Sequence, residues 1–296
     1  YANMGYTYGT SVIVPVNSGS GQSAVIIGNG YVNTGNLRSS LFVINAANGS
    51  LLREIIVPTA SPSGTGGLST PACIDTNSDG RADFYYAGDI DGKLWKFDLT
   101  STSPAAWSVS LLHTTSPAQA ITMAPAVGVH PNGGFMVNFG TGRLLTAADS
   151  TDTSVFYAYG IWDGAPAANA VLLSQTLTTR NYVSGGVTTK LRSVTGNTPN
   201  WTDGAANHRG WRVALPAGER VTGDTVFIES GRFYFNAANP TVVNASPPNG
   251  ENWLMELDFL NGGVANNSLF LDLNGDQLIT NLDRIQYVAA DPPRQE

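Results

Sequence analysis

The stretch that decides the fold class of this chain is DFYYAGDIDGKLWKFDL, residues 83–99. Two runs rich in aromatic and aliphatic residues, Phe84–Ala87 and Leu94–Leu99, enclose the segment GDIDG. Short runs of this kind predict strands, and an Asp-Gly pair between two strands predicts a tight hairpin turn. We therefore interpret GDIDG as a turn and not as a cluster of metal ligands. Residues 83–99 predict one antiparallel hairpin.

The same kind of run recurs along the whole chain, and helical periodicity is almost absent. The further predicted strands are Ser11–Val16, Ala24–Gly28, Leu41–Asn45, Leu51–Val57, Phe135–Phe139, Val155–Ile161, Trp211–Leu215, Val226–Glu229, Arg232–Asn236 and Trp253–Phe259. Many short strands at regular spacing predict an all-β sandwich, barrel or propeller.

A repeat favours the propeller among these three. The second halves of the first three repeat units begin at Leu41, Lys93 and Val155, roughly 50–60 residues apart, which is typical of propeller blades. At about 45–55 residues a blade, the chain is expected to hold five or six blades. We predict a single β-propeller domain over residues 1–296, with an irregular insertion near residues 172–208.

Composition excludes several classes of protein. The chain has 296 residues, with 15 Lys and Arg against 22 Asp and Glu, and it lacks the basic stripe that nucleic-acid binding needs. No apolar run reaches the length of about 18 residues that a membrane-spanning helix requires, so no membrane span is expected. A single cysteine excludes internal disulfide bonds and thiolate zinc clusters. Few lysines and many Asn, Thr and Gly residues fit a secreted protein.

The segment DTNSDGRAD, residues 75–83, predicts a calcium site. Oxygen-bearing side chains stand at alternate positions of this loop, and calcium prefers about 6–8 oxygen ligands. The expected ligands are the side chains of Asp75, Asn77, Asp79 and Asp83 and the backbone carbonyl of Arg81. The alternative interpretation is a solvated loop of Asx turns, because Asp, Asn and Gly are common turn residues.

A second segment, DLNGDQLITNLD at residues 272–283, has the ligand spacing of an EF-hand loop. Its candidate calcium ligands are Asp272, Asn274, Asp276, the carbonyl of Leu278, Thr280 and Asp283. Gln277 stands where glycine normally makes the tight turn, and Asp283 is shorter than the usual glutamate. Both departures weaken the site, and an ordinary polar connection is the alternative.

The remaining chemically notable residues predict no further site. His113, His130 and His208 stand far apart in the sequence, so we expect surface or turn roles for them. Cys73 lies in an apolar run and is expected to be a buried, inert thiol. Trp201 lies in a predicted loop, whereas most of the other tryptophans are expected in the core between blades.

Seven runs of this sequence together carry a resemblance to a known family. They are YTYGTSVIVPV (6–16), AVIIGNGYVNTG (24–35), LFVINAANGSLL (41–52), GGLSTPACIDTNSDGRADFYYAGDIDGKLWKFDL (66–99), APAVGVHPNGGFMVNFGTGRLL (124–145), GWRVALPAGERVTGDTVFIESGRFYFNAANP (210–240) and NWLMELDFLNGG (252–263). The chain resembles, over nearly its whole length, the C-terminal domain of the PilY/PilC family of type IV pilus tip-associated adhesin and biogenesis proteins.

The resemblance implies a modified seven-bladed, quinoprotein-like propeller whose first blades would precede Tyr1. It implies calcium ligation by the residues named above in 75–83, with Asn77 replacing an aspartate common in the family. It also implies export through the periplasm to the outer membrane, the cell surface or the pilus tip. The implied partners are pilins or minor pilins and a host or surface receptor, and the implied roles are pilus biogenesis, retraction control, twitching motility and adhesion.

We therefore expect a calcium-binding propeller that acts by binding partners and is not an enzyme. Two alternatives stay open. A quinoprotein-type dehydrogenase would share the blade repeat, although fold likeness alone is weak support for an activity. A lectin-like surface adhesin would act independently of pili.

Overall fold

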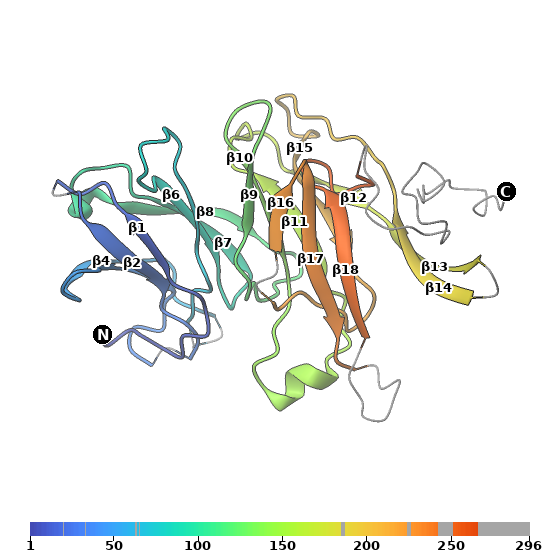
Figure 1. Ribbon diagram of the computed structural model, residues 1–296, viewed down its shortest axis with the longest axis horizontal. Coiled ribbons are helices and arrows are strands. Elements are labelled where there is room, and N and C mark those ends of the chain that lie inside the picture. The colour runs from blue at the N-terminus through green and yellow to red at the C-terminus, as the bar shows by residue number, and fades with distance from the viewer. Residues whose placement is uncertain are drawn as a thin grey trace.

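The computed structural model describes residues 1–265 except 20, 33, 63, 65, 185–186, 224–225 and 242–250. In this part of the chain the secondary structure is strands and two short 3-10 helices, η1 (Pro104–Ala106) and η2 (Ala147–Thr151). The all-β prediction is confirmed. Sheets follow one another along the chain, from the N-terminal sheet at the left of Figure 1 to a hairpin at the right.

The first two sheets are four-stranded antiparallel meanders, which we name blade 1 and blade 2. Blade 1 consists of β1 (Val12–Pro15), β2 (Ser23–Gly28), β3 (Ser40–Asn45) and β4 (Leu51–Ile56). Blade 2 consists of β5 (Ala72–Ile74), β6 (Phe84–Gly88), β7 (Lys93–Asp98) and β8 (Ser108–Thr114). In both sheets each strand pairs with the next one in the sequence, as short turns between alternating runs dictate.

The third sheet, blade 3, has a more complex order. Its strands run β9 (Ala126–Val129), β10 (Phe135–Gly140), β11 (Tyr157–Trp162), β15 (His208–Ala214) and β12 (Val171–Gln175), and β12 is parallel to β15. Between β12 and β15 the chain forms a separate hairpin of β13 (Leu177–Ser184) and β14 (Val187–Val194). Blade 4 consists of β16 (Val226–Glu229), β17 (Arg232–Asn239) and β18 (Glu251–Asp258).

Each predicted strand run coincides with a strand, and the predicted turn between Phe84–Ala87 and Leu94–Leu99 joins β6 to β7. The expected number of five or six blades for the whole chain stays a prediction. The described residues form four blade sheets, and blade 3 alone extends from residue 126 to residue 214. The segment near 172–208, predicted to be an irregular insertion, contains β12 and the β13–β14 hairpin.

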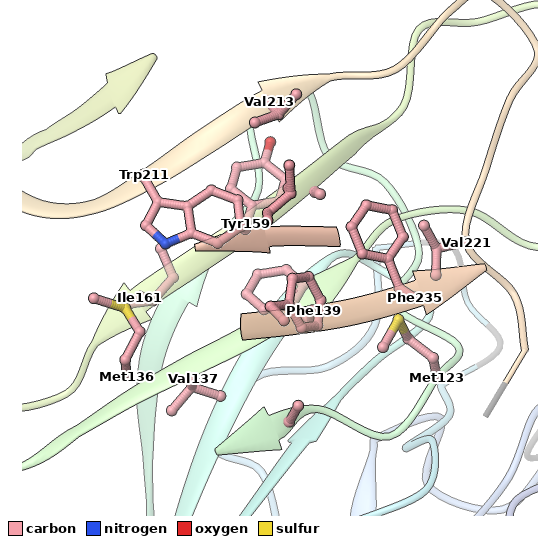
Figure 2. Packing of buried hydrophobic residues seen from close by; sticks show 14 of the residues in the cluster. Met123, Met136, Val137, Phe139, Tyr159, Ile161, Trp211, Val213, Val221 and Phe235 are labelled. Carbon is pink, nitrogen blue, oxygen red and sulfur yellow. The ribbon is translucent and has the colours of Figure 1, made fainter. Parts of the chain in front are cut away.

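Hydrophobic side chains fill the spaces between neighbouring blades. Between blades 1 and 2 the fully buried residues include Ile26, Tyr85 and Phe97. The larger core joins blades 2, 3 and 4, and Figure 2 shows Phe139 of β10 close to Phe235 of β17. This packing follows from the sequence, because each small sheet has two apolar faces and can bury both only between neighbours.

Candidate metal-binding loop

The predicted calcium loop, residues 75–83, connects β5 to β6 on blade 2. Its polar side chains fold it by accepting backbone N–H groups two residues ahead. Asn77 Oδ1 accepts from the Asp79 amide at 2.9 Å, and Asp79 Oδ1 accepts from the Arg81 amide at 2.9 Å. Gly80 adopts φ +83°, in the left-handed region that glycine enters without strain. The alternating oxygens therefore turn toward the loop's own backbone.

Asp75 begins the loop and binds across it. Its Oδ2 accepts the Gly80 N–H at 2.8 Å, and its Oδ1 accepts the Asn77 N–H at 3.2 Å. Desolvation raises the pKa of Asp75, but the backbone N–H groups, that of Gly80 first, together outweigh this effect and lower the pKa below its usual value. The carboxylate is therefore ionised at neutral pH, which is the state that a cation needs.

Asp83 ends the loop in a different environment, because its side chain is buried. Its Oδ1 accepts from Asn17 Nδ2 at 2.8 Å, and its Oδ2 accepts from both the amide and the hydroxyl of Thr76. Asn17 follows β1, and Val16 forms an isolated bridge with Ala82. Asp83 thus links the loop of blade 2 to blade 1.

The donor set of the loop fits a hard cation in its chemistry, since every candidate ligand atom is oxygen. The geometry fits in part. Asp75, Asn77, Asp79 and the Arg81 backbone lie in the turns just described, whereas Asp83 is engaged by Asn17 and Thr76. Within the described ranges, no three His, Cys, Asp or Glu side chains gather into a group that could hold a metal ion. The second candidate loop, residues 272–283, lies outside the described residues.

The link between Asp83 and Asn17 was not predicted from the sequence. The two residues are 66 positions apart, and only the packing of blade 1 on blade 2 brings them together. A second link that was missed joins blades 2 and 3. Asp163 Oδ2 accepts from Lys96 Nζ and from the Tyr86 hydroxyl, each at 2.6 Å. A single polar residue within or beside a strand run does not show, from the sequence around it, which distant residue it pairs with.

His130 lies in the turn between β9 and β10, as expected, and it is fully buried there. Its ring stacks on Trp162 with centroids 4.2 Å apart and meets the edge of Trp201 at 4.9 Å. Burial lowers the pKa of His130 to about 4, against a weaker opposite effect of Asp163. The aromatic neighbours that exclude water from this ring come from distant positions, Trp162 from the end of β11 and Trp201 from a loop.

Cys73 is half-buried on β5, and burial raises the pKa of its thiol. The thiol therefore stays protonated and unreactive.

No helix in the described part of the chain has both the length and the apolar character needed to cross a membrane.

Comparison with known proteins gives consistent matches. The model of a protein family described as the PilY1 β-propeller domain matches residues 1–195. A type IV pilus biogenesis factor PilY1 homolog from Xylella fastidiosa is 35% identical over 293 residues, which cover 89% of this chain. The type IV pilus biogenesis factor PilY1 of Pseudomonas aeruginosa strain UCBPP-PA14 is 29% identical over 326 residues, covering 91% of this chain. This chain spans 19% of the length of the first relative and 28% of the second.

A solved structure matches as well. The crystal structure of the Pseudomonas aeruginosa PilY1 C-terminal domain superposes with a TM-score of 0.80 at 27% identity, covering 95% of this chain and 63% of that chain. The propeller prediction and the resemblance drawn from the sequence are both confirmed by these matches.

Proposed function

The chain belongs to the PilY1 β-propeller family, and on this premise we propose that it is the calcium-binding propeller of a type IV pilus-associated protein. It acts in pilus biogenesis by binding pilins or minor pilins, and not by catalysis. The observation that carries this proposal is the match of the fold to the PilY1 C-terminal domain with a TM-score of 0.80. The names of the curated relatives, which are pilus biogenesis factors, support the pilus association.

The calcium part of the proposal rests on the loop 75–83. Asp75, Asn77 and Asp79, with the Arg81 carbonyl, supply ligands from the loop itself, and Asp83 supplies the last carboxylate. Each carboxylate oxygen can accept more than one partner, so Asp83 can keep its bond to Asn17 while one oxygen turns from Thr76 to the ion. A bound ion then ties the loop to blade 1 and fixes the surface between the two blades.

Affinity is expected in the range of extracellular calcium modules, about 10⁻⁴–10⁻³ M. Occupancy would then follow the calcium level outside the cell, which is where we place the domain, at the cell surface or pilus tip after export through the periplasm. Control of retraction, twitching motility and adhesion to a host or surface receptor are further parts of the proposal. The modified seven-bladed, quinoprotein-like form stays a prediction.

Calorimetry of the purified chain with calcium chloride tests the loop. We expect the double variant Asp75→Asn with Asp79→Asn to weaken binding about tenfold or more, because it removes two of the charges that attract the ion. Asparagine keeps one side-chain oxygen at each position, so the Asx turns can still form, while residue 75 loses one of its two backbone bonds. Alanine at Asp83 is a poorer choice, since it also breaks the buried bond to Asn17.

The matched control is Asp98→Asn. Asp98 makes the same kind of turn, accepting the Thr100 N–H at 2.9 Å, but it lies outside the loop. We expect it to bind calcium as the unchanged chain does. Equal calcium affinity in the double variant and in this control would exclude residues 75–83 as the site.

The pilus part of the proposal has a separate test. Purified minor pilins are mixed with the chain in calcium and in chelator, and the complex is measured by size-exclusion chromatography. Association that needs calcium supports both parts, and association that persists in chelator supports only the pilus part. Absence of any complex with the organism's own minor pilins would contradict the pilus role.

A further inference from the structure

A cavity of about 290 Å³ lies where the segments that lead into the first strand of each blade converge. Blade 1 contributes Tyr8 and Gly9, blade 2 Thr70, blade 3 Thr122 and blade 4 Thr222 and Gly223. The remaining lining residues are Tyr31, Leu144 and Leu145. The first strand of blade 3, β9, lies beside both β5 and β16, so these segments meet near the centre of the blade array.

An isolated β-bridge precedes the lining residues in every blade; it is antiparallel in blades 1, 2 and 4 and parallel in blade 3. Just before the cavity, each lead-in segment makes an isolated β-bridge to its own blade: Tyr6 with Tyr31, Leu68 with Asp89, Ile121 with Gly142, and Arg220 with Ala238. Tyr8, Thr70, Thr122 and Thr222 follow these bridges by one or two positions, and Gly9 and Gly223 follow by three. In each of the four blades, therefore, an isolated bridge comes shortly before a residue that lines the cavity, although no sequence motif repeats there.

The walls are held firmly by buried neighbours. Met123 and Val221, adjacent in sequence to Thr122 and Thr222, have no exposed surface and lie in the core shown in Figure 2. Tyr31 is 5% exposed, and its hydroxyl donates to the Thr122 carbonyl at 3.4 Å. Sites that need little rearrangement lose less free energy on binding a ligand.

The lining is uncharged, aromatic on one side and rich in hydroxyl groups. Tyr8 stacks on Tyr31 with centroids 6.4 Å apart, and the Tyr8 side chain is 71% exposed. Thr70 Oγ accepts the Thr10 N–H at 3.1 Å and can still donate its own proton. Thr122 Oγ donates to the Gly142 carbonyl at 2.8 Å and can still accept. The cavity thus offers both donors and acceptors beside an aromatic face.

Among the described residues, the charged side chain nearest to the lining along the chain serves another region. Arg143, which precedes Leu144, pairs with Asp149 at 2.8 Å and lines a separate cavity of about 560 Å³. A charged ligand would therefore find no partner among the residues that line the smaller cavity.

We propose that this cavity binds one neutral pyranose ring of a saccharide. A pyranose has an apolar C–H face, which packs on an aromatic ring whose face is electron-rich, and hydroxyl groups around its edge, which match the threonines. The volume lies near the lower end of ligand pockets, about 300–1,000 Å³, which limits the ligand to a small one. This inference goes beyond the proposed function and does not depend on calcium.

Saturation-transfer NMR on the whole chain tests the proposal with three probes: methyl α-D-glucopyranoside, methyl α-D-mannopyranoside and methyl β-D-galactopyranoside. We expect transfer to the ring protons of at least one probe. Tyr8→Ala removes the exposed aromatic face and should weaken binding about fivefold, as expected for one aromatic contact. Thr222→Val keeps the shape and removes one hydroxyl, so it should weaken the same signal.

The matched control is Tyr6→Ala. Tyr6 is 64% exposed and lies two residues from Tyr8, but it does not line the cavity, and its bridge to Tyr31 uses only backbone atoms. We expect it to bind the probe as the unchanged chain does. Absence of transfer to all three sugars, or a signal equal in Tyr8→Ala and Tyr6→Ala, would overturn the proposal, and so would an unchanged signal in Thr222→Val.

Discussion

Blades 2 and 3 are neighbouring sheets that differ in how their strands are connected along the chain. In blade 2 the strands β5 to β8 follow in order within residues 72–114, and each pairs with the next. In blade 3 the strand β11 ends at Trp162, and its partner β15 begins only at His208. The intervening chain adds the parallel strand β12 and the β13–β14 hairpin (Figure 1).

The two blades are stabilised by contacts of different range. The β6–β7 turn of blade 2 is organised by Asp89, which accepts the N–H groups of Asp91 and Lys93 and the Trp95 indole N–H at 2.7 Å. In blade 3, Gln175 at the end of β12 donates to the carbonyls of Asn197 and Asn261. A short turn joins the central strands of blade 2. In blade 3, buried polar side chains fix the path of the long segment between β11 and β15, which we call the excursion.

The largest effect is expected from breaking the anchor of that excursion. Arg192 on β14 makes two bonds to Glu219, at 2.5 and 2.6 Å, and both side chains are buried. The Arg192 guanidinium also lies 3.8 Å from the centre of the Trp253 ring. Glu219→Gln leaves a buried cation without its counter-charge, so we expect a loss of about 3–5 kcal/mol in the free energy of unfolding, measured with urea.

The control for this variant is Glu251→Gln, which removes the partner of Lys190 at 3.4 Å. The Lys190 side chain is 59% exposed, so the pair is expected to contribute only about 0–1 kcal/mol. Similar losses in both variants would contradict the idea that the buried anchor holds the excursion.

The contrast between the blades also explains which strands could be predicted from the sequence and which could not. The β6–β7 hairpin was predicted because its turn residues and its apolar runs are adjacent. The strand β8, SVSLLHT, was missed because polar residues interrupt its apolar pattern. The Thr-rich strands β13 and β14 were assigned to an irregular insertion, and the parallel pairing of β12 with β15 has no local signal.

The candidate loop shows the same limit. Its Asx turns follow directly from alternate Asp and Asn residues, and the structure contains them at Asn77 and Asp79. The position of Asp83 does not follow from the loop alone, because Asn17 reaches it from another blade. The cavity near Tyr8 could not be predicted at all, since its residues come from segments far apart in the sequence that only the fold brings together.

An intermediate effect is expected from adding one methyl group to the turn of blade 2. Gly92 has φ +80°, and a Cβ there would lie 2.3 Å from Thr115 Oγ and 2.6 Å from the Gln119 carbonyl oxygen. Gly133, in the β9–β10 turn of blade 3, has φ +89° and no atom within 4 Å of its Cβ position. We expect Gly133→Ala to lower the free energy of unfolding by about 1–2 kcal/mol through the backbone alone.

Gly92→Ala should be worse by about 1–3 kcal/mol, because it adds overpacking to the same backbone effect. Urea unfolding of the two alanine variants side by side measures the difference. Equal losses would show that the turn of blade 2 can relax away from the segment that leads to blade 3.

The last effect concerns the boundary between the two blades and is visible only as a dependence on pH. His113 lies on β8 of blade 2, with its ring centroid 5.7 Å from that of Tyr159 on β11. Burial first, and then the charges of Arg209 and Arg212, lower the pKa of His113 to about 4. In the unfolded chain a histidine has a pKa of about 6.5, so the unfolded state binds the proton first as the pH falls.

The stability that depends on a neutral His113 is therefore complete above pH 6.5 and is lost as the pH falls toward 4. Between pH 7 and pH 5 this residue alone accounts for about 2 kcal/mol of lost unfolding free energy. We expect His113→Phe, which keeps an aromatic ring against Tyr159 but cannot be protonated, to lose correspondingly less over the same interval. Urea unfolding at both pH values makes the comparison, and an unchanged pH dependence in the variant would mean that His113 takes up its proton within the folded chain. The contact between blades 2 and 3 would then be open to water at this point, unlike the buried core beside it.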